Sequence, residues 1–173
     1  MALTVEDGTG LTNADSYLSS ADADSYHTKH SNSSSWSGAS TSVKEAALRM
    51  ATQYINVTYR LRWKGIKIYK DQALDWPRLS VVDRDGYNIA ADSLPQAIKD
   101  ACAEMALREV TETNSLIVDE ASPGRIKRET DKGGAIESTV EYMGGRSQQK
   151  KFTLIDRILS DLIEPIAFVL ERA

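Results

Sequence analysis

The sequence predicts a mainly α protein: a small helical bundle of about four helices with a long anchored loop and one β-hairpin. Three observations support this fold class. Apolar residues recur at the spacing of one helical face in two long segments. Residues 59–91, between those segments, show no sustained periodicity and form the predicted loop. A Gly-Gly pair at residues 133–134 separates two alternating segments, which is a hairpin signal.

The first elements are an arm, a short helix and a polar loop. Residues 1–12 contain two glycines and no regular pattern, so they predict an arm or loose strand. Ser19, followed three residues later by Asp22, is a variant of the capping box, and the helix is expected at about residues 20–30. Serine and glycine dominate residues 31–42 and predict a polar loop with Trp36 as its anchor.

Each of the two long helices has an apolar face. The second helix is expected to begin after Ser93, a good N-cap, with Pro95 tolerated in its first turn, and to end near Thr111. The face of the first helix consists of Val43, Ala46, Ala47, Met50, Ala51, Tyr54 and Ile55, and that of the second of Leu94, Ala97, Ile98, Ala101, Cys102, Met105 and Ala106.

The long connection between these helices needs large side chains to hold it, because structureless loops of that length are uncommon in compact domains. Trp63, Tyr69 and Trp76 are the expected anchors. Pro77 restricts the backbone at Trp76, and residues 83–86 supply turn formers. We therefore predict structural roles for Trp63 and Trp76.

The C-terminal part predicts a hairpin, a linker, a last helix and a tail. Lys127 and Arg128 of the first strand can face Glu137 and Glu141 of the second. Residues 143–151 have the composition of a flexible linker, and the apolar residues from 152 to 163 form a helix that Pro165 ends. We expect one domain over residues 1–164, with the hairpin at 125–142, and a C-terminal docking tail at 165–173.

Composition narrows the classes of function. The 173 residues carry a net charge of −4, so the protein is not basic overall. Cys102 is the only cysteine, which excludes an intramolecular disulfide. No segment resembles a secretion signal or a membrane span, so we expect a soluble protein that works without export and without a membrane partner.

Catalysis and metal binding find little support. Cys102 lies on an apolar helix face without a basic neighbour, and neither a Gly-x-Ser-x-Gly elbow nor a phosphate-binding glycine loop is present. His27 and His30 could bind a metal only if other ligands converged, and packing is the commoner fate of such a pair. Asp83-x-Asp85-Gly86 lacks the later acid of a calcium loop. We expect no enzyme, no cofactor and no metal site.

A basic stretch with interleaved aromatic residues runs from Tyr59 to Lys70 and contains no acid. Because its five positive charges stand against a total of −4, the other residues carry −9. Single-stranded DNA could use the cations for phosphates and the rings for stacking bases. Alternatively, the rings hold the loop and the cations meet acidic patches of neighbouring subunits, which is the interpretation we favour. The cations are Arg60, Arg62, Lys64, Lys67 and Lys70.

An ordered set of short segments resembles the small head-tail connector (adaptor) proteins of tailed bacteriophages. Some relatives in that family carry the label of a DnaT-like single-stranded-DNA-binding protein. The serine-rich loop at residues 31–42 and the apolar tail after Pro165 depart from the pattern. The matching segments are residues 5–10, 14–17, 44–48, 74–78, 82–86, 94–98, 126–129 and 155–159.

The resemblance implies a structural virion protein that forms a ring, typically dodecameric, and joins the phage portal to a tail, nozzle or stopper protein. It would be located in the virion neck, and in the host cytoplasm during assembly, with at most weak contact to packaged DNA. The alternative is a single-stranded-DNA-binding module that uses residues 59–70. The expected portal-docking tail contains Ile166, Phe168, Val169 and Leu170, and the expected subunit-interface hairpin contains Ile126, Lys127, Arg128, Glu137, Val140 and Glu141.

Overall fold

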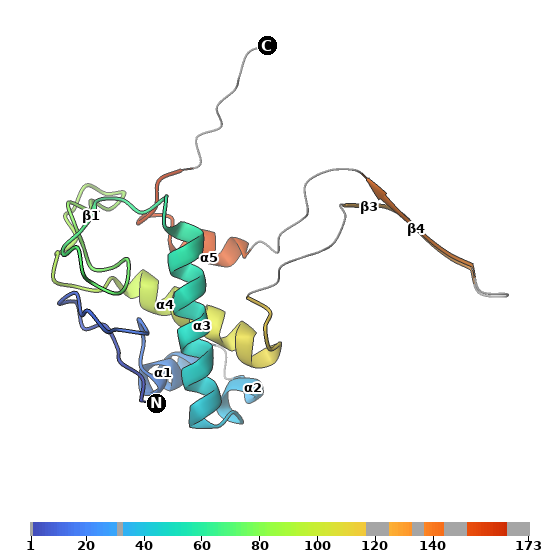
Figure 1. Ribbon diagram of the computed structural model, residues 1–173, viewed down its shortest axis with the longest axis horizontal. Coiled ribbons are helices and arrows are strands. Elements are labelled where there is room, and N and C mark those ends of the chain that lie inside the picture. Colours follow the sequence, from blue (N-terminus) through green and yellow to red (C-terminus); the bar gives the residue numbers. More distant parts are fainter. Residues whose placement is uncertain (1, 31–32, 117–124, 133–136, 144–151, 166–173) are drawn as a thin grey trace, which may run out of the picture. The chain divides into compact units, whose positions relative to one another are not determined.

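The computed structural model describes residues 2–30, 33–116, 125–132, 137–143 and 152–165 (Figure 1). These ranges are mainly helical and contain one β-hairpin, which confirms the predicted fold class. The elements are α1 (Ser20–His30), α2 (Ser34–Ser37), α3 (Thr41–Tyr59), β1 (Ile66–Lys67), β2 (Arg78–Leu79), α4 (Gln96–Thr111), β3 (Arg125–Lys132), β4 (Glu137–Met143) and α5 (Thr153–Ile158).

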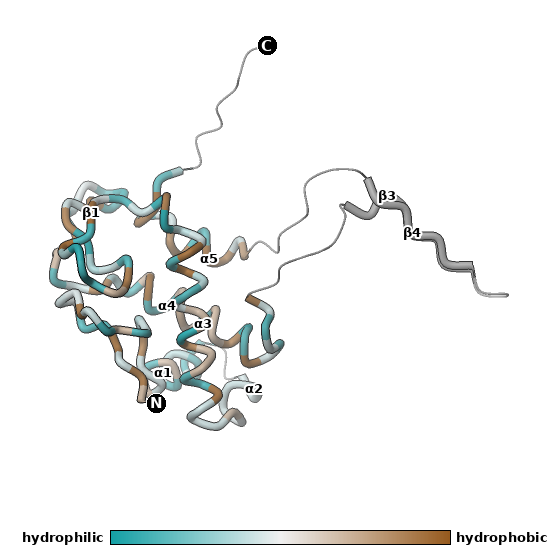
Figure 2. Tube along the Cα trace, in the orientation of Figure 1, coloured by the Kyte–Doolittle hydropathy of each residue, from teal (hydrophilic) through white to brown (hydrophobic). Residues whose placement is uncertain are grey.

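The chain divides into two compact units. The helical unit comprises residues 1–117 and 153–173, and the second unit comprises residues 118–152. In the helical unit, α3 packs along α4, and α4 also contacts α5. Figure 2 shows hydrophobic and hydrophilic residues alternating along these helices, as expected for elements that cover a core on one side. No helix among the described residues is long and apolar enough to cross a membrane.

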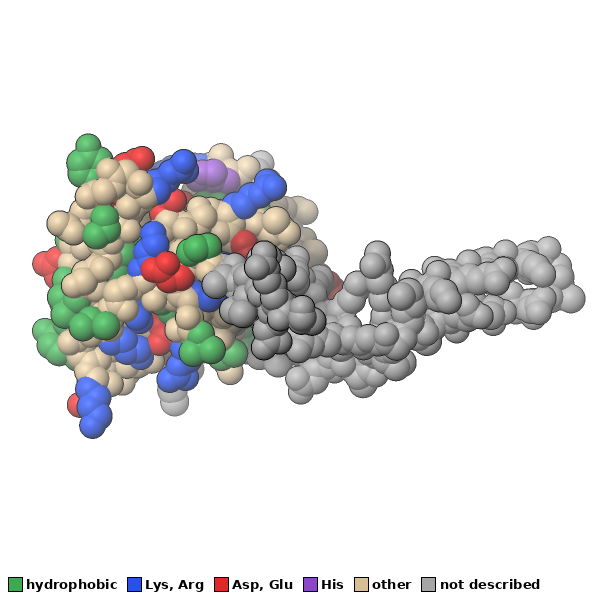
Figure 3. Space-filling view, turned by 90° about the horizontal axis from the view of Figure 1, so that it is seen from above, with side chains coloured by type: hydrophobic (Ala, Val, Ile, Leu, Met, Phe, Trp, Pro, Cys, Tyr) green, Lys and Arg blue, Asp and Glu red, His purple; other side chains and the backbone are tan. Residues whose placement is uncertain are grey.

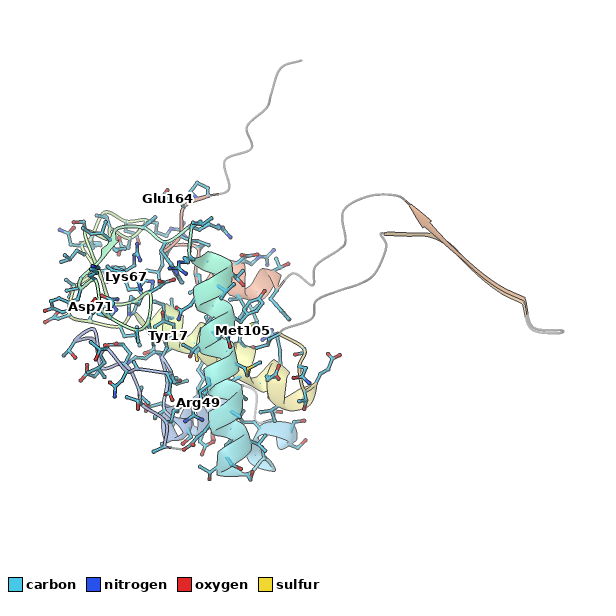
Figure 4. All side chains as sticks on the ribbon, in the orientation of Figure 1. Tyr17, Arg49, Lys67, Asp71, Met105 and Glu164 are labelled. Carbon is cyan, nitrogen blue, oxygen red and sulfur yellow. The ribbon has the colours of Figure 1, made fainter. Side chains whose placement is uncertain are left out.

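The core lies where α3, α4 and α5 meet. Leu48 and Ile55 of α3, Met105 of α4 and Ile155 of α5 are completely buried, and Figure 4 places Met105 beside α3. Burying each such side chain contributes about 1.5–3 kcal/mol before the cost of ordering it. Small residues such as Ala51 allow α3 and α4 to approach closely.

The core-facing side of α3 differs from the predicted apolar face. The prediction included Val43 and Ala46, but both are exposed, and Met50 and Tyr54 are only half-buried. The periodicity shows which apolar residues share a side of the helix. It does not show whether each of them packs against the rest of the protein. The buried residues of α3 are Ala47, Leu48, Ala51, Thr52, Ile55 and Tyr59.

Two predicted boundaries also change. Ser93 is not the N-cap of α4: its hydroxyl donates to the carbonyl of Ala90 at 2.8 Å, and Pro95 occupies the cap position without a side-chain cap. The polar loop at residues 31–42 contains the single-turn helix α2, and α3 already begins at Thr41. Trp36 is buried as predicted, and its indole N–H donates to Asp24 at 2.7 Å.

The second unit contains the predicted antiparallel hairpin, β3 with β4. Arg128 lies opposite Glu141, as predicted, whereas Glu137 lies opposite Lys132. Lys127 falls at an irregularity between Ile126 and Arg128 and has no partner position in the register. The register also places Ile126 opposite Tyr142 and Val140 opposite Glu129. The predicted docking residues Ile166, Phe168, Val169 and Leu170 lie outside the described residues.

Candidate nucleic-acid interface

The N-terminal arm is fixed by a buried carboxylate. Glu6 accepts hydrogen bonds from the backbone N–H groups of Gly8 (3.0 Å), Gly10 (2.9 Å) and Leu11 (3.0 Å). Gly10 has φ of +77°, and a Cβ atom there would lie 2.9 Å from the ring of Tyr69. This position therefore requires glycine, and the arm lies directly against the long loop.

A buried tyrosine connects the arm, α3 and the loop. The hydroxyl of Tyr17 donates to the amide oxygen of Asn56 and accepts from the backbone N–H groups of Asp75 (3.2 Å) and Trp76 (3.3 Å). Burial raises the pKa of Tyr17 well above its usual range. The tyrosine therefore stays protonated and holds residues 75–76 against α3.

The two loop tryptophans are structural, as predicted. Trp76 is completely buried and meets Trp63 edge to face, with ring centroids 5.8 Å apart. Trp63 in turn packs against Tyr59 at 5.7 Å. Because the rings of Tyr59 and Trp63 are buried, they are not open to a stacking base.

Arg78 closes the loop from within, a role that the sequence prediction missed. Its guanidinium donates to the carbonyls of Lys64 (2.8 Å), Gly65 (2.6 Å) and Asp75 (3.2 Å). Burial lowers the pKa of Arg78. The position of this arginine, directly after a Trp-Pro pair, could have indicated its role. Carbonyl groups in a tight loop need hydrogen-bond donors, and arginine has several.

Gln72 also holds the loop together through side-chain hydrogen bonds, and the sequence did not predict this role. Its side-chain amide donates to the carbonyls of Leu74 (2.9 Å) and Pro77 (3.1 Å), and its oxygen accepts from the N–H of Tyr69 (3.0 Å). Together with Arg78, it turns residues 64–78 into an ordered surface rather than a loose connection.

Two of the five predicted cations are paired with carboxylates of their own chain. Arg62 lies 3.3 Å from Asp156 and over the ring of Tyr59. Lys67, labelled in Figure 4, lies 3.2 Å from Asp75, whose side chain is almost buried. These pairs attach the loop to α5 and to its own turn, so the two cations are not primarily free charges for a phosphate.

The other three cations pair with no carboxylate among the described residues. The ammonium of Lys64 donates to the carbonyl of Asp161 at 2.7 Å and lies 3.4 Å from that of Val82, and neither contact neutralises it. Arg60 and Lys70 are exposed and have no ion pair within the described ranges. Residues 59–91 contain seven basic and four acidic side chains, although the whole chain is acidic.

The same segment of the chain carries exposed apolar and aromatic side chains as well as these cations. Tyr69 is 58% exposed, and Tyr87, which lies outside the predicted stretch, is 72% exposed. Ile66 and Leu79 face each other across β1 and β2 and are also exposed. Figure 3 shows hydrophobic and basic side chains interspersed on the helical unit. We call the following set the loop face: Arg60, Lys64, Ile66, Tyr69, Lys70, Leu79, Arg84 and Tyr87.

The other candidate sites have ordinary structural explanations. Burial raises the pKa of Cys102 to about 11, so its thiol is unreactive at neutral pH. His27 packs on Trp36 with ring centroids 4.7 Å apart, and His30 stacks on Tyr26 at 4.3 Å. No group of three or more potential metal ligands occurs within the described part of the chain. Asp83 accepts two backbone N–H groups and forms the predicted turn.

A family model described as "Putative DnaT-like ssDNA binding protein" matches residues 1–173. No curated protein and no solved structure matches the chain. The match contradicts the prediction of a structural virion protein that joins the portal to a neck or tail component, and it agrees with the alternative. The predicted ring assembly, partners and virion location stay predictions.

The resemblance to connector proteins has a structural explanation. The short segments that suggested a connector contain Glu6, Tyr17 and Arg78, which hold the arm and the loop together. Such residues specify a fold, and a fold does not determine a role in a virion. Because the family model covers every residue, the chain belongs to the DnaT-like ssDNA binding protein family.

Proposed function

We propose that this protein binds single-stranded DNA through the loop face. The observation that carries the proposal is the match of the whole chain to a family described by single-stranded-DNA binding. The loop face is chemically suitable, because it combines exposed rings with cations that form no ion pair within the described ranges. Single-stranded DNA needs both, since its bases are open to stacking and its backbone is charged.

The bases contact the apolar part of the loop face. Tyr69 and Tyr87 each present an exposed ring, and Ile66 and Leu79 provide an aliphatic surface on β1 and β2. Stacking of one base on an aromatic side chain contributes about 1–3 kcal/mol and depends little on base identity. Binding should therefore tolerate different sequences.

The phosphates contact Arg60, Lys64, Lys70 and Arg84. Neutralising a phosphate releases bound counterions, so affinity falls as salt rises. Only a few such cations are present and the net charge is −4, so binding at physiological salt should be weak, in the micromolar range or above.

Fluorescence anisotropy with a labelled oligothymidine, measured at several salt concentrations, tests the proposal. Tyr69→Ala and Tyr87→Ala should each weaken binding about 5- to 150-fold, which corresponds to one lost stacking contact. Tyr69→Phe is the matched control, because it keeps the ring and should bind like the wild type. A duplex of the same length should bind less tightly. Binding that ignores salt, or alanine variants that bind like the wild type, would contradict the proposal.

A further inference from the structure

The ring of Tyr69 is exposed, although the chain around it is fixed. Trp63 and Trp76, the other two predicted anchors of the loop, are buried, whereas Tyr69 is 58% exposed. The backbone N–H of Tyr69 donates to the side-chain oxygen of Gln72 at 3.0 Å, and Gln72 is itself buried. The value of Tyr69 as a stacking surface therefore depends on what holds the ring itself.

The N-terminal arm contacts one edge of this ring. A Cβ atom at Gly10 would lie 2.9 Å from Cδ2 and 3.4 Å from Cε2 of Tyr69, and the other ring atoms lie farther away. These two carbons form one edge of the ring, so Gly10 packs against that edge and not on a face. An edge contact limits how the ring can turn, and it leaves both faces free of Gly10. A stacking surface needs this geometry, because bases stack on ring faces.

The arm is itself held firmly at this point. One carboxylate oxygen of Glu6 accepts hydrogen bonds from the backbone N–H groups of Gly8 at 3.0 Å and Gly10 at 2.9 Å. On the other side of Gly10, the carbonyl of Leu11 accepts from the N–H of Ala73 at 2.9 Å, which attaches the arm to the loop. Glu6 and Gly10 are both buried. The ring of Tyr69 therefore rests against a fixed segment of backbone.

We propose that Gly10, supported by Glu6, is a positioning residue for DNA binding: it holds the Tyr69 ring in the orientation in which a base stacks on it. This inference rests on the proposed function and adds to it two residues that act through Tyr69. A ring that is fixed before binding loses less freedom when a base stacks on it, so its orientation increases affinity. Tyr87 lies in a separate turn, where its backbone bonds to Asp83. The arm should therefore influence one of the two exposed rings and not the other.

Gly10 and Gly8 form a matched pair for testing this role. Both have a positive φ, +77° at Gly10 and +104° at Gly8, so alanine is strained at either position. At Gly10 the added methyl group meets the ring of Tyr69, a side chain that can turn away. At Gly8 it would lie 2.5 Å from the backbone oxygen of Asp92. Gly10→Ala should therefore displace the ring, whereas Gly8→Ala strains the same arm against a different neighbour.

Anisotropy titrations of the whole protein with oligothymidine test the coupling between Gly10 and Tyr69. Gly10→Ala should weaken binding about 2- to 12-fold, the change expected when one side chain must be immobilised on binding. The same substitution should have no further effect in a Tyr69→Ala background and its full effect in a Tyr87→Ala background. Gly8→Ala should bind like the wild type. If Gly10→Ala does not fold, Glu6→Gln takes its place in both backgrounds, because it keeps the size of the side chain and weakens the support of Gly10.

Fluorine NMR of protein labelled with fluorotyrosine reports the ring in the absence of DNA. The Tyr69 resonance is the one that Tyr69→Phe removes, and Gly10→Ala should shift it whereas Gly8→Ala should not. Equal losses of affinity from Gly10→Ala in the two tyrosine backgrounds, or an unchanged Tyr69 resonance, would overturn the positioning role even if Tyr69→Ala weakens binding. A Tyr69→Ala variant that binds like the wild type would instead overturn the proposed function, and this inference with it.

Discussion

Four of the five basic-loop residues should separate into two groups when replaced in pairs. Arg60 and Lys70 are unpaired within the described residues, so replacing both by alanine should leave folding intact and reduce the salt dependence of DNA binding. Each lost phosphate contact on a single strand lowers the slope of log affinity against log salt by about 0.7. The double variant should therefore lose about 1.4 from that slope.

Arg62→Ala with Lys67→Ala is the matched pair, since it removes the same number of charges from the same stretch. Its main effect should be on stability, because Asp75 is nearly buried and would lose its ion-pair partner. Leaving a buried charge without its hydrogen-bond donor costs about 2 kcal/mol. Anisotropy titrations at three salt concentrations give the slopes, and urea unfolding gives the free energies. Equal slopes for both double variants, or a normal stability for Arg62→Ala with Lys67→Ala, would refute this division of the cations.

Three further predictions concern the framework. Trp76→Ala should lower the free energy of unfolding by about 3–5 kcal/mol in urea titrations, and a variant with wild-type stability would show that the ring is not part of the core. Glu6→Ala should cost about 2 kcal/mol or more and speed proteolysis of the arm, because three backbone N–H groups lose their acceptor. Burial lowers the pKa of His27, so near pH 6.5 the unfolded chain takes up a proton that the folded chain does not. Stability should fall from pH 7 toward pH 5 by at most about 1.4 kcal/mol per pH unit, and His27→Gln should flatten this dependence in urea titrations.

The elements that the sequence predicted well depend on local signals. The capping residues before α1 and the Gly-Gly pair in the sequence between β3 and β4 are signals within a few positions, so the sequence alone predicts the helix and the two strands. Trp63 and Trp76 were predictable because large apolar side chains in a polar connection need a core to enter. The side of α3 that packs inward was not predictable, because Val43 and Val57 contribute to the apolar period without contributing to the core.

The sequence indicated the basic stretch, but it did not indicate which of its cations form ion pairs. Arg62 binds Asp156 across 94 residues, and no short-range pattern distinguishes it from Arg60, which has no ion pair in the part of the chain that the structure describes. Tyr87 was missed because it follows β2 instead of belonging to the basic stretch, although folding adds it to the exposed surface. Contacts between distant segments therefore decide which residues remain available to a ligand.

The dependence of the loop on the N-terminal arm affects how the chain folds during synthesis. Tyr17 leaves the ribosome 58 residues before the backbone group of Asp75 that it binds. At typical elongation rates this interval lasts about 3 to 12 seconds. During that time, the hydroxyl of Tyr17 lacks the backbone N–H groups of Asp75 and Trp76 that it binds in the folded chain, so nascent chains of this length are the stage most exposed to proteases and chaperones. Because contacts of such long sequence separation form late, closure of the arm onto the loop is expected to limit the rate of folding.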